Sequence, residues 1–153
     1  MKLGDVLKKE REKAKLAIQD VATKLAVPQS EYEAIEAGNS DAERWGPILA
    51  LIAIELETPT SRLVAESGRS SDAKPGQVGA LIRSHRERKR KAAGDLARSV
   101  GLSAEELEQV EAGRSALEQW APRFLAFAEA IEQPVFNLFY PCGLPFAEID
   151  DYP

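Results

Sequence analysis

The sequence contains few of the residues on which many active sites depend. Its 153 residues include one histidine and one cysteine. A single histidine excludes the HExxH zinc motif, and we find neither a Gly-rich phosphate-binding loop nor a set of Cys and His ligands. The lone cysteine, Cys142, cannot form a disulfide within the chain, which agrees with a reducing compartment. We therefore expect no enzyme activity, no metal and no cofactor.

Long hydrophobic runs and a strong positive charge are missing as well. No stretch approaches the roughly 18 consecutive apolar residues of a membrane span, and the first residues lack the apolar core of a signal peptide. We therefore expect a cytoplasmic protein with no membrane partner. The formal net charge of −5 argues against a protein that coats nucleic acid non-specifically, because such binding needs many Lys and Arg side chains.

What the sequence does contain is an internal repeat. Glu36-Ala37-Gly38 recurs as Glu111-Ala112-Gly113, a shift of 75 residues (111 − 36) without a gap. Tryptophan and proline landmarks follow the same shift, and a segment rich in turn-forming residues separates the two copies. We predict a first domain, a linker, a second domain and an aromatic, proline-rich C-terminal tail at residues 1–66, 67–76, 77–139 and 140–153.

Apolar residues in both copies recur at helical spacing. Val21, Ala22 and Leu25 of the first copy correspond to apolar residues at the same positions of the second. Long alternating runs of strand-forming residues are missing. The sequence therefore predicts an all-α fold with about five short helices in each copy.

Within each copy one segment reads as a helix, a tight turn and a second helix. Residues 16–38 contain the turn Ala26-Val27-Pro28 and close on Ile35-Glu36-Ala37-Gly38, and residues 91–113 match them. This pattern resembles the helix-turn-helix of the phage repressor and Cro (XRE-like) family, over nearly the whole chain except the linker and about the last dozen residues. The resemblance implies two tandem lambda-repressor-like domains in a transcriptional regulator.

The resemblance also implies an internal ion pair that ties the first helix to the end of the third. Arg11 with Glu36 and Arg86 with Glu111 occupy these positions, so we expect structural roles for all four.

Two further pairs of residues have structural interpretations. Trp45 and Trp120 recur before a helix, so we expect both to pack on the core. Ser103 with Glu106 three residues later reads as a capping box at the start of a helix.

Carried over residue by residue, the family's base-reading positions and the one basic run supply candidate DNA contacts. Gln29 can form two hydrogen bonds with adenine, and Ser30 can donate or accept, whereas Glu105 in the second copy can only accept. The run 83–91 can reach a phosphate backbone, or it is simply a solvated face. The DNA-contact candidates are Gln29, Ser30, Arg88, Lys89, Arg90, Lys91, Arg98, Gln109 and Arg114.

Other residues favour a protein partner over duplex DNA. Ile18 and Ala93 replace the polar residue with which the family anchors a phosphate, and neither reading helix carries a Lys or Arg. Glutamates on these helices bring carboxylates toward a surface that would face phosphates. The candidates for protein interaction are Glu33, Glu105 and Glu108, with Phe146 and Tyr152 in the tail. Two hypotheses therefore stay open: a regulator that binds operator DNA, and an adaptor that binds another protein, with a homodimer possible in either.

Overall fold

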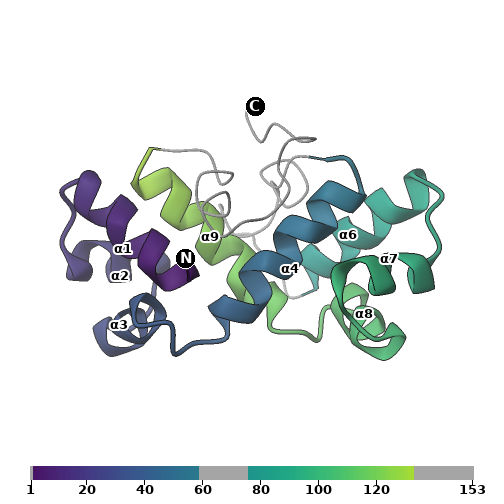
Figure 1. The fold of residues 1–153 in the computed structure, drawn as a ribbon, viewed down its shortest axis with the longest axis horizontal. Coiled ribbons are helices and arrows are strands. Elements are labelled where there is room, and N and C mark those ends of the chain that lie inside the picture. Colours follow the sequence, from purple (N-terminus) through teal and green to yellow (C-terminus); the bar gives the residue numbers. More distant parts are fainter. Residues whose placement is uncertain (1, 59–75, 133–153) are drawn as a thin grey trace.

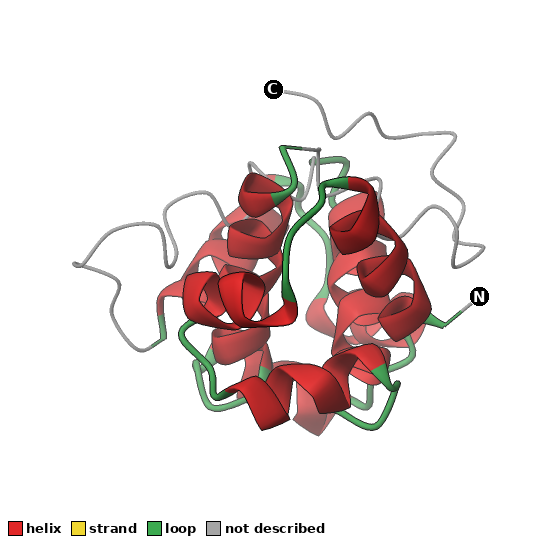
Figure 2. Ribbon diagram, turned by 90° about the vertical axis from the view of Figure 1, so that its left-hand side faces the viewer, coloured by secondary structure: helices red, strands yellow, loops and turns green. Residues whose placement is uncertain are grey.

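The computed structural model describes residues 2–58 and 76–132, and within these ranges the chain is all-helical (Figures 1 and 2). The all-α class is confirmed, with eight helices and no strand among the described residues. The first repeat contains α1 (Leu3–Lys13), α2 (Ile18–Leu25), α3 (Gln29–Glu36) and α4 (Ala42–Glu55). The second contains α6 (Gln77–Arg88), α7 (Ala93–Val100), α8 (Ala104–Glu111) and α9 (Leu117–Ala130).

The helices follow the repeat closely. The helices α2, α3 and α4 begin and end 75 residues before α7, α8 and α9, respectively. For example, α2 begins at residue 18 and α7 at residue 93. Four of the predicted helices in each copy are thus described. A fifth in each copy, most of the predicted linker, and the tail with Cys142, Phe146 and Tyr152 lie outside the described residues.

The first turns of α1 and α4 are joined by a carboxylate. Glu43 accepts hydrogen bonds from the backbone N–H groups of Leu3 and Gly4, at 3.1 and 2.8 Å. Its counterpart Glu118 accepts from Val78 and Gly79, at 3.2 and 2.7 Å. These carboxylates satisfy N–H groups that a helix start leaves unpaired, and they keep the start of α4 and α9 with their own repeats.

Beyond their first turns α4 and α9 leave their own repeats. Figure 1 shows them crossing at the centre of the molecule, α4 running toward α6 and α7 and α9 toward α1 and α2. The contacts agree, because α4 packs on α7 and α9, and α9 packs on α2 as well as on α4. Each repeat is therefore completed by a helix of the other.

The composition of α4 explains why it lies between two partners. A helix at the surface of a core buries one apolar stripe, whereas a helix that is apolar on most sides must be covered on most sides. Nine of its residues are buried: Ala42, Trp45, Gly46, Ile48, Leu49, Ala50, Ile52, Ala53 and Ile54. The buried residues of both repeats accordingly form one continuous core, which includes Trp45 and Trp120 at 8% and 6% exposure.

Among the helices of residues 2–58 and 76–132, none combines the length and the apolar character that a membrane span requires.

Candidate partner-binding face formed by α3 and α8

The helices α3 and α8 occupy equivalent places in the two halves of the molecule. Figure 1 shows both on its lower side, one at each end, flanking the region where α4 and α9 begin. Each packs on its own repeat, α3 on α1 and α2, and α8 on α6 and α7. We call the exposed side of this pair the α3/α8 face.

A residue in the left-handed backbone conformation precedes each of the two helices. Ala26 follows α2 with φ 57°, and Gly101 follows α7 with φ 79°, which reverses the chain before the next helix starts. At the start of α8 the predicted capping box is confirmed. Ser103 Oγ accepts from the Glu106 N–H, and Glu106 Oε1 accepts from the Ser103 N–H, both at 3.1 Å.

Both predicted ion pairs are present. Arg11 donates to Glu36 through Nε and Nη2, at 2.6 and 3.1 Å, and a third bond of 2.9 Å runs from Nη1 to the Leu16 carbonyl. Arg86 binds Glu111 in the same way, at 2.6 and 2.9 Å. The hydrogen bond to Glu36 raises the pKa of Arg11, despite its partial burial. These pairs connect α1 to α3 and α6 to α8.

The two carboxylates on the exposed side of α3 both have partners within the protein. Gln29 and Ser30 are exposed, as a base-reading role would require. The amide of Gln29 donates to Glu33 at 3.0 Å, and Glu31 forms an ion pair of 3.1 Å with Arg123 of α9. Arg123 neutralises the charge of Glu31, whereas the neutral Gln29 amide leaves the charge of Glu33 in place. The repulsion expected from the sequence of α3 is therefore reduced but not removed.

The α8 helix keeps more of its negative charge. Glu106 pairs with Arg44 of α4, and Glu111 is held by Arg86. Glu105 and Glu108 are exposed and, in the described part of the chain, have no hydrogen-bond or ion-pair partner. Gln109 is exposed beside them. The two halves of the α3/α8 face therefore differ in charge.

The starts of α2 and α7 offer little to a phosphate. Ile18 is half-buried and packs against the core, and Asp20 accepts from the Ala17 N–H at 3.1 Å. A carboxylate of the protein thus already accepts a hydrogen bond from an N–H group at the start of α2, where a phosphate would otherwise bind. At the start of α7, Ala93 is exposed, and Asp95 pairs instead with Arg98 at 3.5 Å.

The basic run lies away from the start of α8. Lys91 binds Glu55 at 2.7 Å and Lys89 lies 3.8 Å from Glu57, so the run sits beside the C-terminal end of α4. Arg44, which pairs with Glu106, is 11 residues earlier on this helix (55 − 44), which is about 16 Å along its axis.

Two further basic candidates lie outside this run. Arg98 is on α7 and Arg114 follows α8, and both are exposed. Of the basic candidates, Lys89 and Lys91 are paired with glutamates, and Arg98 is paired with Asp95 of its own helix.

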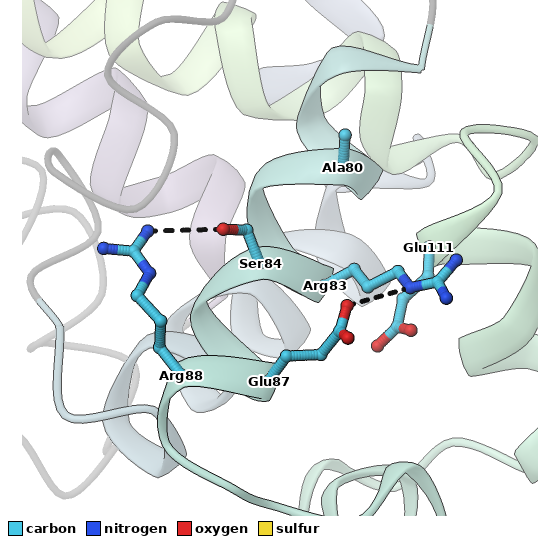
Figure 3. A pocket seen from close by; sticks show the side chains of 6 residues that line it. All are labelled: Ala80, Arg83, Ser84, Glu87, Arg88 and Glu111. Atoms are coloured by element: carbon cyan, nitrogen blue, oxygen red, sulfur yellow. Dashed lines mark hydrogen bonds and ion pairs between the residues drawn. The ribbon is translucent and has the colours of Figure 1, made fainter.

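An open hollow of about 540 Å³ lies beside α6 (Figure 3). It is lined by Ala80, Arg83, Ser84, Glu87, Arg88 and Glu111. Arg83 pairs with Glu87 at 3.1 Å, and Arg88 donates to Ser84 at 3.4 Å. Among the described residues no cluster of His, Cys, Asp and Glu suits a metal ion. Balanced charges leave this hollow without a distinct ligand preference.

Two arginines that the sequence pattern did not single out connect the halves of the molecule. Arg44 and Arg123 lie on the crossing helices and bind glutamates of the opposite repeat. The shift of 75 residues relates Glu31 to Glu106, so the repeat could have pointed to these two glutamates. It does not relate the two arginines to one another.

Comparison with known proteins returns no relative. No protein-family model matches this chain, and no curated protein sequence or solved structure matches it either. The interpretation of the α3/α8 face therefore rests on the chain's own residues.

Proposed function

We propose that the chain is a transcriptional regulator that binds operator DNA through the α3/α8 face, with its two repeats acting as the halves of a pseudo-dimer. The observation that carries the proposal is the equivalent placement of α3 and α8 on one side of the molecule (Figure 1). Dimeric helix-turn-helix proteins read two half-sites with such a pair of helices. Gln29 and Ser30, exposed at the start of α3, supply the polar groups that would contact base edges.

Charge opposes this role less at α3 than at α8. Glu31 and Glu33, the carboxylates in its exposed middle, are engaged by Arg123 and by the Gln29 amide. Gln29 would exchange its bond with Glu33 for one with a base, which leaves Glu33 as the one carboxylate of α3 without a partner among the residues that the structure describes. We therefore expect the first repeat to contribute most of the base contacts.

A protein-binding adaptor is the second candidate, and α8 favours it. Glu105 and Glu108 project two unneutralised carboxylates where phosphates would come close, and this repulsion opposes DNA. The same carboxylates suit a basic protein surface. Because fold does not determine function, the two candidates are separated by measurement.

The first experiment is a salt-dependent titration of the full chain against random and operator-like duplex DNA, read by fluorescence anisotropy. A regulator binds with an affinity that falls steeply as salt rises. Replacing Glu105 and Glu108 by Gln removes the repulsion and should tighten binding. Glu129→Gln with Glu132→Gln removes two exposed carboxylates at the C-terminal end of α9 and just after it, so it is the control with the same change in charge and should leave affinity unchanged. Absence of binding at low salt and about 10 µM duplex would exclude the DNA proposal.

The second experiment tests the adaptor. A basic partner captured by the wild-type chain should be lost when Glu105 and Glu108 are changed to Lys, and retained when Glu129 and Glu132 are changed to Lys instead. Equal capture by all three proteins would contradict a role for this face.

A further inference from the structure

Glu31 and Glu106 are equivalent residues (106 − 31 = 75), and each binds an arginine from the opposite repeat. Glu31 on α3 pairs with Arg123 on α9, and Glu106 on α8 pairs with Arg44 on α4. Both glutamates are the third residue of their helices. The same position of each helix is therefore attached to a helix that crosses from the other half.

The two arginines reach their glutamates from different turns. Arg44 corresponds to Gln119 in the second repeat, and Arg123 corresponds to Ile48 in the first. Arg123 thus stands one helical turn further along α9 than Arg44 does along α4. The two arginines therefore do not occupy equivalent positions of the repeat, yet each repeat receives an arginine–glutamate contact from the other.

Each arginine is also held by a tryptophan of its own helix. The guanidinium carbon of Arg44 lies 4.8 Å from the ring centre of Trp45, and that of Arg123 lies 4.9 Å from the ring centre of Trp120. A guanidinium over an indole face is attracted to it. Because both tryptophans are core residues, each arginine lies between a ring that is anchored in the core and a glutamate of the opposite repeat.

We propose that Arg44 and Arg123 are positioning residues that fix the spacing and orientation of α3 relative to α8. We call the two assemblies, Glu106–Arg44–Trp45 and Glu31–Arg123–Trp120, the cross-repeat latches. The role of these arginines in half-site spacing rests on the proposed function. A pair of reading helices selects half-sites of one separation only if its own separation is fixed.

The exposure of the latches separates a positioning role from a stabilising one. The side chains of Arg44 and Glu106 are 52% and 40% exposed, and those of Arg123 and Glu31 are 20% and 43% exposed. Exposed ion pairs contribute little to folding stability. Loss of the latches should therefore leave the unfolding midpoint nearly unchanged, so that a change in the placement of α3 and α8 can be measured in a folded chain.

The test measures the distance between α3 and α8 by pulsed electron spin resonance in the full chain. Spin labels are attached at Ala37→Cys and Ala112→Cys, two exposed, equivalent positions after these helices, with Cys142→Ser removing the native thiol. The wild-type background should give one narrow distance distribution. Arg44→Met with Arg123→Met keeps the aliphatic stems, removes both latches and should broaden the distribution.

Two further variants complete the experiment. Arg98→Met breaks an exposed ion pair within α7 and should leave the distribution narrow. Exchanging charges, Glu31→Arg with Arg123→Glu, should restore a narrow distribution relative to Arg123→Met alone. Glu31 suits this exchange because the residue at the N-cap of α3, Pro28, has no N–H for it to cap.

The outcomes distinguish the latches from the proposed function. An unchanged distribution in the folded double Met variant overturns the latches, and equal broadening in Arg98→Met does the same. If the double variant does not fold, Glu31→Gln, which leaves Arg123 on Trp120, is measured against the same criteria. Latches that respond as expected in a chain that binds no duplex would overturn the DNA proposal alone.

Discussion

The Cα of Gly4 packs directly against the carbonyl oxygen of Ile35, so closely that a Cβ on Gly4 would lie 2.5 Å from that oxygen. The same relationship joins Gly79 to Val110, where a Cβ would lie 2.1 Å from the carbonyl oxygen. Glycine at these two positions lets α1 and α6 approach the ends of α3 and α8.

We therefore predict that Gly4→Ala and Gly79→Ala each lower the free energy of unfolding by about 2 kcal/mol, because the helices must move apart. Urea denaturation followed by circular dichroism measures the change. Gly94→Ala on α7 is the matched control, since a Cβ there meets no atom within 4 Å. It should stabilise by about 0.5–1 kcal/mol through helix propensity. A Gly4→Ala variant as stable as the wild type would contradict the close packing.

Breaking one ion pair between the first and third helices should destabilise the chain more than breaking an exposed one. The side chains of Arg11 and Glu36 are 10% and 8% exposed, so Arg11→Met leaves a carboxylate largely shielded from water. We expect a loss of about 3 kcal/mol by urea denaturation. Arg83→Met, which breaks an ion pair whose side chains are 62% and 58% exposed, should cost under about 0.5 kcal/mol. Similar losses in both variants would contradict this difference.

Tyr32 carries a hydroxyl that its surroundings do not satisfy. The residue is fully buried, and its hydroxyl has no hydrogen-bond partner among the described residues. Its counterpart in the second repeat is Leu107, which shows that an apolar side chain fits the equivalent site. We predict that Tyr32→Phe raises the free energy of unfolding by about 1 kcal/mol. A loss of stability of that size would mean that the hydroxyl is bonded after all.

The same tyrosine should make the protein sensitive to alkali. Burial raises the pKa of Tyr32 above its ordinary range, and the nearby Glu36 carboxylate adds to the effect. With the folded pKa above the unfolded value of about 10, stability is fully present below pH 10 and falls above it, because only the unfolded chain ionises.

We expect the unfolding free energy of the wild type to fall faster above pH 10 than that of Tyr32→Phe. Tyrosinate absorbance in a Tyr140→Phe, Tyr152→Phe background should remain low until the chain unfolds. Titration of Tyr32 near pH 10 in the folded protein would contradict its burial.

The crossing helices predict what happens when the repeats are separated. Expressed alone, residues 1–75 lack α9, which packs on α2, and residues 76–153 lack α4, which packs on α7. Each half therefore exposes apolar surface, and we expect it to be unfolded or a dimer that exchanges the long helix. Light scattering and circular dichroism decide this, with an equimolar mixture of halves as the control that should regain helicity. Two folded monomeric halves would contradict the packing.

Much of the local structure follows from residues that lie close together in the sequence. The helical spacing of apolar residues predicts the described helices, and Ser103 with Glu106 predicts the cap, because both depend on a few consecutive residues. The family resemblance predicts the Arg11–Glu36 pair, because it places these two positions together. The binding candidates Gln29, Ser30, Glu105 and Glu108 are exposed as their roles require, and those roles stay predictions.

The repeat, the all-α class and the faces that must be buried can all be inferred from the order of the residues. Which repeat buries the long helices α4 and α9 is apparent only in the folded chain. The apolar pattern is the same in both copies, so it specifies that a helix must be covered without specifying by which copy. The choice depends on the direction in which α4 and α9 leave Glu43 and Glu118, and on pairs such as Arg44–Glu106 that exist only once the helices have crossed.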